Sequence, residues 1–297
     1  MRTLIVGCGY VGTALGAELS RQGHEVFGVR RSEAGRGELE KAGIQLLHAD
    51  ITRPDSLTRL PGPFDWIVNT ASAGQGGAAE YRQIYLEGNR NLLAWMRLAP
   101  AKKYVYTSST GVYGQTDGTA VKEESPIQPP NETGAILWET EQLLTGAALD
   151  WKCPAVILRV AGIYGPDRGY HFRQYLADTA KIEGDGHRYL NMIHRDDLVG
   201  IITTTLKSGR AGDVFNAVDD EPVTQLHFFR WLSETLGKEL PPFDPLADQA
   251  ERKRGWTNKK VLNRKLKMQL GYTFRYPTFR QGYTAEILRL ESLPGNL

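Results

Sequence analysis

Residues 3–16 read TLIVGCGYVGTALG, and this stretch decides the fold. The apolar run from Leu4 to Val6 predicts a short buried strand, and apolar residues then recur at helical spacing along YVGTALGAELSRQG. Between them lies a G-x-G-x-x-G turn, the arrangement that brings a backbone loop and a helix N-terminus against a dinucleotide pyrophosphate. We therefore predict that the turn binds such a cofactor through Gly7, Gly9, Tyr10, Val11 and Gly12.

The end of the second predicted strand, EVFGVR, bears on the choice of cofactor. An NAD site commonly offers an acidic residue there, which binds the ribose 2′-hydroxyl. This chain has Arg30 and Arg31 instead. A guanidinium group can bind a 2′-phosphate through two hydrogen bonds or stack on adenine, although both arginines could also be solvated loop charges. The pattern favours NADP as the cofactor, and NAD remains possible.

Strands and helices alternate along the first half of the chain, which predicts an α/β fold with a Rossmann-type, doubly wound parallel sheet. We expect a dinucleotide-binding domain over 1–164 and a smaller C-terminal substrate lobe mainly over 165–297, with the chain crossing back after the lobe begins. We assign to the lobe the strand DVFNAV and helices near 170–182, 195–207, 224–236 and 277–292. GPDRGY at 165–170 and PPFDP at 241–245 are loop signals.

The composition is that of a globular protein. The chain has 297 residues, 41% of them hydrophobic, and a net charge of +2, so nothing indicates a nucleic acid or membrane partner. Cys8 and Cys153 lie in apolar contexts and are expected to be buried free thiols. No apolar run is long enough to span a bilayer, and we expect a cytoplasmic protein. The basic segment 251–272 is interpreted as a solvated surface, where Arg252 or Lys259 could meet an anionic substrate.

Further motifs follow in order along the chain. They are HADI at 48–51, NTASA at 69–73, YTSSTGVYG at 106–114, LRVAGIYGP at 158–166 and NMIHRDDL at 191–198. Together with the glycine turn, this set resembles the extended short-chain dehydrogenase/reductase superfamily, the NAD(P)-dependent epimerase/dehydratase family. The resemblance covers nearly the whole chain, and it implies the fold and the cofactor described above.

The resemblance also implies roles for residues at the strand ends. Asp50 and Ile51 would bracket the adenine. Ser109 stands where the family keeps a catalytic Ser or Thr, four residues before the Tyr of VYG, although its hydroxyl could simply bond local backbone. The remaining implied cofactor contacts are Thr70, Ala71 and Ser72 along the ribose and phosphates, and Thr107 and Val160 near the nicotinamide.

The chain departs from the family where the family does its chemistry. In NETGAILWETE, residues 131–141, the family's general acid/base Tyr is replaced by Thr133 and its Lys, four residues later, by Leu137. A threonine hydroxyl does not titrate near neutral pH, and leucine carries no charge. The Asn that the family keeps in the preceding long helix becomes Tyr85. The resemblance therefore implies the cofactor but not the standard mechanism.

Three interpretations follow. The chain could be an enzyme of the epimerase/dehydratase or reductase kind with a relocated acid/base, for which Tyr85 is the candidate unless it is a core aromatic. It could be a non-catalytic NADP(H) sensor or scaffold. It could have inherited the fold alone, although the intact glycine turn argues against this. His194 is expected to brace the lobe. The substrate is an unknown small molecule, possibly like a nucleotide sugar, and no metal ligand is predicted.

We also expect a homodimer, because the family commonly pairs two long helices, here about 78–99 and 132–149. The apolar residues that could supply that contact are Leu92, Leu93, Trp95, Leu143 and Leu144.

Overall fold

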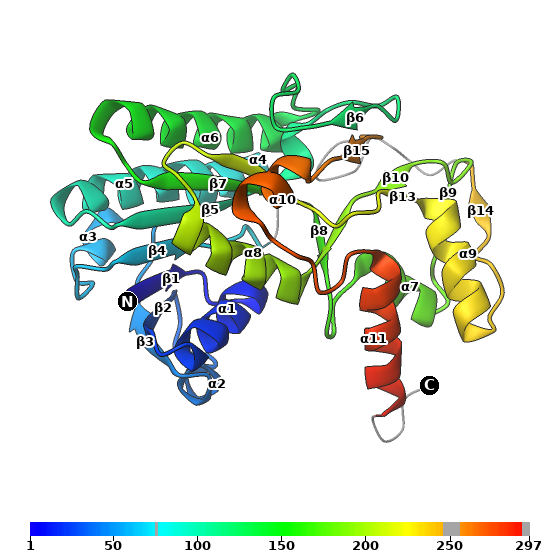
Figure 1. Cartoon of the computed structure of the whole chain (residues 1–297), viewed down its shortest axis with the longest axis horizontal. Coiled ribbons are helices and arrows are strands. Elements are labelled where there is room, and N and C mark those ends of the chain that lie inside the picture. The colour runs from blue at the N-terminus through cyan, green and yellow to red at the C-terminus, as the bar shows by residue number, and fades with distance from the viewer. Residues whose placement is uncertain (75–76, 246–255, 293–297) are drawn as a thin grey trace.

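A computed structural model describes residues 1–74, 77–245 and 256–292, and its centre is a seven-stranded sheet in the order β12-β7-β5-β4-β1-β2-β3 (Figure 1). Every pairing in this sheet is parallel. The strands are β1 (Arg2–Val6), β2 (Glu25–Arg30), β3 (Ile44–His48), β4 (Trp66–Asn69), β5 (Lys103–Ser109), β7 (Ala155–Val160) and β12 (Val214–Ala217). The predicted doubly wound parallel sheet is confirmed.

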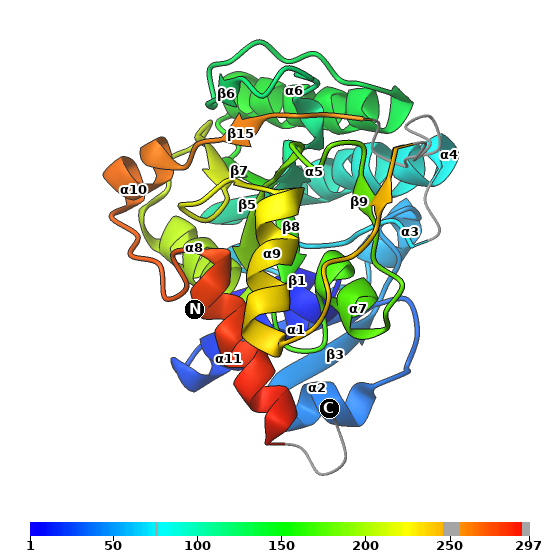
Figure 2. The same cartoon turned by 90° about the vertical axis from the view of Figure 1, so that its right-hand side faces the viewer.

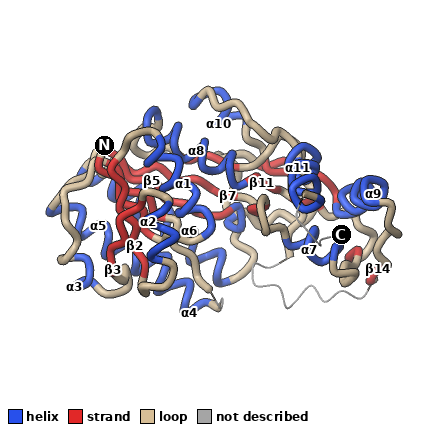
Figure 3. Tube along the Cα trace, turned by 90° about the horizontal axis from the view of Figure 1, so that it is seen from below, coloured by secondary structure: helices blue, strands red, loops and turns tan. Residues whose placement is uncertain are grey.

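Helices cover both faces of the sheet because its strands are apolar on both sides. Helices α4 (Ala78–Tyr81), α5 (Gly88–Leu98) and α6 (Glu132–Trp151) lie on one face, and α1 (Tyr10–Arg21) and α8 (Arg195–Ser208) on the other (Figure 1). The shorter helices α2 (Arg36–Lys41) and α3 (Pro54–Leu57) join the first strands. Figure 3 shows the sheet at one end of an elongated molecule and the C-terminal lobe at the other.

The long helix expected over 78–99 is present but is not α-helical throughout. A π-helical segment, η1 (Arg82–Glu87), separates α4 from α5. The side-chain amide of Asn89, which is fully buried, donates to the backbone oxygen of Tyr85 at 2.6 Å. Because π-bulges widen a helix and leave carbonyl oxygens without their usual partner, this amide stabilises the irregular turn.

Three expected lobe elements differ in the structure. The strand DVFNAV is not in the lobe, since β12 pairs with β7 at the edge of the central sheet. The helix expected near 195–207 is not in the lobe either, because α8 is the crossover before β12 and packs beside α1 and β5. The helix expected over 170–182 is shorter: α7 spans Tyr170–Leu176. It ends there because Asp178 takes a left-handed conformation (φ 54°), and the chain then enters strand β9 (Ile182–Glu183).

The lobe has its own aromatic core beyond the central sheet. Helices α7, α9 (Gln225–Leu236) and α11 (Phe279–Glu291) surround it (Figure 2). Its buried rings are Tyr164, Phe172, Tyr175, Phe228, Phe229, Phe279 and Tyr283. Short strand pairs complete the lobe and its junction with the sheet: β8 (Gly162–Tyr164) with β11 (Met192–His194), β10 (Tyr189–Leu190) with β13 (Val223–Thr224), β9 with β14 (Phe243–Asp244), and β6 (Ala120–Val121) with β15 (Lys260–Val261).

The basic segment 251–272 is only partly the solvated surface that its charge predicts. Residues 251–255, including Arg252, lie outside the described part. In the remainder, Lys259, Val261 and Leu266 are buried, because β15 pairs with β6 and α10 (Arg264–Leu270) packs beside β12. Among the described residues, no helix has the length and apolar content needed to cross a membrane.

Candidate functional site

The main cleft follows the carboxyl ends of the strands, where parallel α/β sheets bind ligands. It has a volume of about 610 Å³ and runs from the ends of β2 and β3, past the turn after β1, to the ends of β5 and β7. The predicted cofactor residues that line it are Gly7, Gly9, Tyr10, Val11, Arg30, Arg31, Asp50, Ile51, Thr70, Ala71, Ser72, Thr107 and Val160. Both candidate catalytic residues, Ser109 and Tyr85, also line it.

The three glycines of the turn serve different purposes. Gly7 has φ 87°, and a Cβ there would lie 2.6 Å from the backbone nitrogen of Ala71. Gly12 does not line the cleft, and a Cβ there would lie 2.4 Å from the carbonyl oxygen of Gly7. Gly9 caps α1 and has no atom within 4 Å of a Cβ position, so its face is open to a ligand. This shape fits a pyrophosphate that approaches the backbone at the start of α1.

The two arginines at the end of β2 are arranged differently. The half-buried Arg30 donates from Nε to the Cys8 carbonyl at 2.6 Å and from Nη1 to the Ala34 carbonyl at 2.7 Å. It therefore braces the glycine turn against the loop after β2. Arg31 is exposed and lines the cleft, so its guanidinium can reach a ligand. The pair supplies positive charge where a 2′-phosphate would lie.

The ends of β3 and β4 form one wall of this half of the cleft. The Asp50 carboxylate accepts from both the amide and the hydroxyl of Thr52, at 2.9 and 2.8 Å. The side chain of Ile51 is buried against Gly88 of α5. The Thr70 hydroxyl donates to the Gly7 carbonyl at 2.8 Å, which fixes the glycine turn to the end of β4.

The opposite half of the cleft carries the candidate chemical groups. The Ser109 hydroxyl accepts from the backbone N–H of Gly111 at 3.1 Å, the local backbone contact that its position at the strand end allows. Tyr85 is half-buried, with its ring centre 4.9 Å from that of Tyr81. Its hydroxyl oxygen accepts from the backbone N–H of Ala73 at 3.4 Å. Tyr85 is therefore both a packed aromatic and part of the cleft wall.

The positions predicted to correspond to the family's Tyr and Lys hold no acid/base pair. Thr133 is buried at the start of α6, and its hydroxyl donates to Asn131, the residue that caps this helix, at 3.0 Å. Leu137 is buried too, and its apolar side chain lines the cleft. Within the described lining there is no lysine or histidine, and its one carboxylate, Asp50, follows β3 at the other end.

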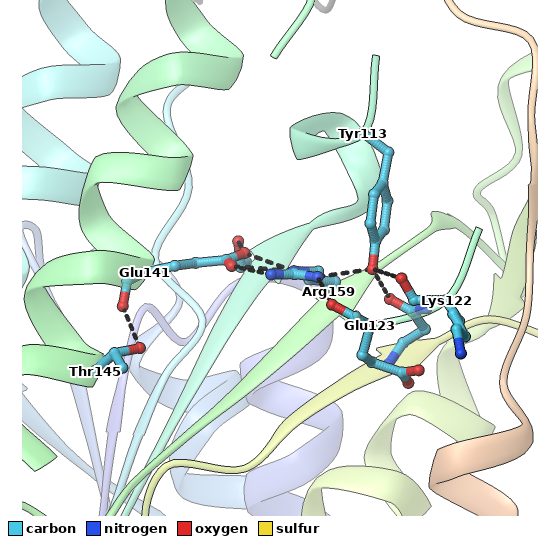
Figure 4. Close-up of polar contacts among 8 residues, drawn as sticks. Tyr113, Lys122, Glu123, Glu141, Thr145 and Arg159 are labelled. Carbon is cyan, nitrogen blue, oxygen red and sulfur yellow. Dashed lines mark hydrogen bonds and ion pairs between the residues drawn. The ribbon is translucent and has the colours of Figure 1, made fainter. Parts of the chain in front are cut away.

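A buried ion pair lies beneath this half of the cleft. Arg159 of β7 reaches Glu141 of α6 at 2.8 Å and donates to the Tyr113 hydroxyl at 2.7 Å (Figure 4). The Ser108 hydroxyl, at the cleft wall, donates to Glu141 at 2.6 Å. Burial alone would lower the pKa of Arg159, but the Glu141 carboxylate raises it above its usual value. The network fixes α6 to β5 and β7, and of its members Ser108 lines the cleft whereas Arg159, Glu141 and Tyr113 do not.

His194 and Lys259, which the sequence analysis singled out, both have structural roles outside the cleft. The buried imidazole of His194 accepts from the Asp196 N–H at 3.1 Å and packs against Tyr276, so it stabilises the lobe as expected. The Lys259 ammonium donates to the Tyr113 carbonyl at 2.6 Å and to the Thr257 hydroxyl at 3.0 Å. Burial lowers its pKa to about 7. It ties the C-terminal segment to the VYG loop rather than lining the cleft.

The lining residues that sequence reasoning did not predict include Leu137 and also Arg168, from the loop before α7. The GPDRGY loop signal marked that loop, but nothing in the local sequence shows that it reaches the glycine turn. The two cysteines are buried free thiols, as expected, and burial raises the pKa of Cys8 to about 12.

The apolar residues expected to form a dimer interface mostly belong to the monomer core. Leu92, Leu93 and Leu144 are buried within the chain, and Trp95 and Leu143 are partly buried against the same core. The solvent side of these helices carries an ion pair of Arg82 of η1 with Glu139 of α6 at 3.2 Å, and also the exposed Leu98 of α5 and Leu149 of α6. Leu92, Leu93 and Leu144 are therefore not available for the predicted contact, and the homodimer itself stays a prediction.

Comparisons with known proteins agree with this geometry. The model of the NAD dependent epimerase/dehydratase family matches residues 3–217. The protein YeeZ of Escherichia coli is 29% identical over 284 residues, which cover 93% of this chain and 96% of YeeZ. A UDP-glucose 4-epimerase of Corynebacterium glutamicum is 25% identical over 310 residues, which cover 94% of this chain and 93% of the relative.

Solved structures show the same fold along nearly the whole chain. A Methylobacillus flagellatus protein, provisionally described as an NAD-dependent epimerase/dehydratase, is 31% identical with a TM-score of 0.77, over 98% of each chain. The dTDP-glucose 4,6-dehydratase DesIV of Streptomyces venezuelae, solved with NAD and TYD bound, is 23% identical with a TM-score of 0.84, over 98% of this chain and 97% of DesIV. The chain belongs to the NAD-dependent epimerase/dehydratase family.

Proposed function

We propose that this protein binds NADP(H) in the main cleft and reduces a small carbonyl compound. The binding half of the proposal is supported by the open face of Gly9, the glycine turn fixed by Thr70 and the exposed Arg31. The related DesIV structure contains NAD, so the preference for NADP rests on the two arginines of this chain.

The observation that carries the reductase proposal is the set of titratable groups at the Ser109 end of the cleft. Epimerases and dehydrogenases begin by removing a proton from a hydroxyl, which requires a general base. The described lining there contains tyrosines but no lysine, histidine or carboxylate. A phenol gives up a proton readily to a developing alkoxide, so this arrangement favours reduction of a carbonyl over oxidation of an alcohol.

When bound, the reduced nicotinamide supplies a hydride to the carbonyl carbon. Tyr85 transfers its hydroxyl proton to the carbonyl oxygen as the C=O π bond breaks, and water then returns a proton to the phenolate. A phenol oxygen that accepts one hydrogen bond, as Tyr85 does from Ala73, can still donate its own hydrogen. The Ser109 hydroxyl donates a hydrogen bond to the same substrate oxygen and orients it. Leu137 adds an apolar side chain to the wall at this end of the cleft.

The test is NADPH oxidation, followed by absorbance, with a panel of small aldehydes and ketones. Tyr85→Phe should lower the single-turnover rate by about 10²- to 10⁴-fold, the usual contribution of general acid–base catalysis. The Kd for NADPH should change less than about twofold, because no hydrogen bond to the cofactor is removed. Tyr81→Phe is the matched variant. If it lowers the single-turnover rate more than Tyr85→Phe does, the proton donor is Tyr81 and not Tyr85.

A second candidate is a non-catalytic NADP(H) sensor, favoured by Thr133 and Leu137 at the family's acid/base positions. Both candidates require NADPH binding, and only the reductase requires turnover. Tight binding with no oxidation of NADPH across the panel would favour the sensor. Absence of binding to either dinucleotide would contradict both.

A further inference from the structure

The loop between β8 and α7 brings a charged side chain from the lobe to the glycine turn. Its Arg168 guanidinium carbon lies 4.9 Å from the centre of the Tyr10 ring, and Arg168 lines the main cleft together with Gly7 and Gly9. Tyr10 is the first residue of α1, directly after the glycine that is open to a ligand. A residue 158 positions along the chain from Tyr10 therefore shares the wall where a pyrophosphate would bind.

The loop is held in this position from two sides. On the side of the glycine turn, the Tyr10 hydroxyl donates to the Pro166 carbonyl at 3.0 Å. On the side of the lobe, the Asp167 N–H donates to the buried carboxylate of Glu286 in α11 at 3.0 Å. Arg289, also in α11, pairs with the Asp167 side chain at 2.5 Å. Arg168 is therefore placed by fixed neighbours before any ligand binds, and preorganisation lowers the entropic cost of binding.

The loop also requires unusual backbone. Gly165 and Gly169 have φ of 139° and 150°, and a Cβ at Gly169 would lie 2.8 Å from the Tyr283 hydroxyl. Asp167, between them, is left-handed at φ 60°. The loop thus turns tightly against the lobe core while presenting Arg168 outward.

Among the described residues, no negative charge is paired with Arg168. Its contact with the Tyr10 ring is a cation–π interaction, and no described carboxylate pairs with it. Arg195 lies over the same ring at 5.1 Å but pairs with Asp196 at 2.9 Å. Of these two arginines, Arg168 has the guanidinium available for an anion.

We propose that Arg168 binds the pyrophosphate of the dinucleotide and joins the lobe to the cofactor. The assignment rests on the NADP(H) binding proposed above. The glycine turn supplies backbone N–H groups from one side, and Arg168 supplies a fork of N–H donors from the other, which suits two adjacent phosphates. NADH and NADPH share the pyrophosphate, so Arg168 increases the affinity for both equally. Arg31 instead contributes to the preference for NADPH over NADH.

Fluorescence titrations of the full chain with NADH, NADPH and ADP-ribose test the assignment. Arg168→Ala should weaken all three ligands by the same factor, on the order of tenfold or more, since a hydrogen bond to a charged group is lost. ADP-ribose carries the pyrophosphate but no nicotinamide. Arg168→Lys should recover part of the affinity, because the charge remains while the fork is lost.

The matched control is Arg173→Ala, an exposed arginine on α7 that does not line the cleft, and it should leave all three affinities unchanged. Normal binding by the wild type together with unchanged binding by Arg168→Ala would overturn this assignment and leave the proposed function intact. Loss of NADH and NADPH affinity with ADP-ribose unaffected would also overturn it, by placing Arg168 at the nicotinamide. Failure of the wild type to bind any of the three would overturn both proposals.

Discussion

The two halves of the cleft are built on different principles. The half around the glycine turn uses backbone groups, glycines and arginines, and its contacts fix the turn to β2 and β4. The half around Ser109 presents aliphatic and hydroxyl side chains, with Leu137 at a family acid/base position and a buried ion pair beneath it. The contrast shows that one half of the cleft is shaped mainly by the path of the backbone, whereas the other half is defined by its side chains.

The physical reason is that the two halves depend on the fold in different ways. A glycine turn between a strand and a helix is part of the chain path, so replacing Gly7 or Gly12 would cause clashes of the backbone itself. Thr133 and Leu137 are buried side chains on α6, so a change of residue there alters side-chain packing and not the path of the chain. If these positions correspond to the family's acid/base pair, its replacement is compatible with the sheet and helix seen here.

The largest expected effect concerns the buried Arg159–Glu141 ion pair beneath the Ser109 half of the cleft. Arg159→Met should lower the free energy of unfolding by about 3–5 kcal/mol, because the buried Glu141 carboxylate would lose its positively charged partner and keep only the Ser108 hydroxyl. Arg82→Met removes an exposed pair with Glu139 and should cost only about 0–1 kcal/mol. Urea denaturation measures both. Equal losses would mean that burial does not distinguish the two pairs.

The next largest effect concerns how Arg30 and Arg31 contribute to dinucleotide affinity in the glycine-turn half of the cleft. Arg31→Ala should narrow the preference for NADPH over NADH, since a charge-assisted contact is typically worth about 1.5–3 kcal/mol. Arg30→Ala should weaken both dinucleotides, because it releases the Cys8 carbonyl and loosens the turn. The double variant should narrow the preference as well. Equal affinity of the wild type for NADPH and NADH would refute the role of the arginines in binding a 2′-phosphate.

A pH-dependent effect tests how the C-terminal segment is attached to the loop after Ser109. Burial lowers the pKa of Lys259 to about 7 from 10.5. Between these values the folded state binds fewer protons than the unfolded chain, so this residue makes stability rise with pH and imposes its full cost below about pH 7. Lys259→Met removes this pH-dependent contribution to the free energy of unfolding. The stability of the variant minus that of the wild type should therefore be greatest near pH 6 and should fall towards pH 10.

Urea denaturation at several pH values between 6 and 10 measures this difference, after the constant loss of two hydrogen bonds is subtracted. Lys41→Met, at an exposed lysine of α2, is the matched control and should show no comparable trend. A difference between Lys259→Met and wild type that stays flat across the range would contradict a buried, readily neutralised ammonium.

The smallest expected effect comes from restoring the family pair. Thr133→Tyr with Leu137→Lys should leave UDP-glucose epimerisation low, because Tyr85 still occupies the place of the family's Asn. A coupled assay for the epimerised sugar measures this. Robust turnover of a common nucleotide sugar by the wild type would show that another group moves the proton well, and would remove the contrast between the two halves of the cleft.

The sequence by itself determined the parts of the molecule that depend on neighbours along the chain. The G-x-G-x-x-G turn, the alternating strands and helices, and most residues at the strand ends could be placed because parallel strands bring their carboxyl ends to one edge. The family resemblance, and not the strand pattern, pointed to Ser109 and Tyr85, and both line the cleft, although their roles stay predictions.

Only the tertiary structure decided the features that join distant segments. Arg168 reaches the glycine turn because α11 holds its loop, and Lys259 is buried because β15 returns to β6. The charges of 251–272 predicted a solvated surface, since periodicity cannot show which lysine a later strand pairing will bury. Likewise β12 joined the central sheet rather than the lobe, because a strand's partner depends on the crossover before it and not on its own residues.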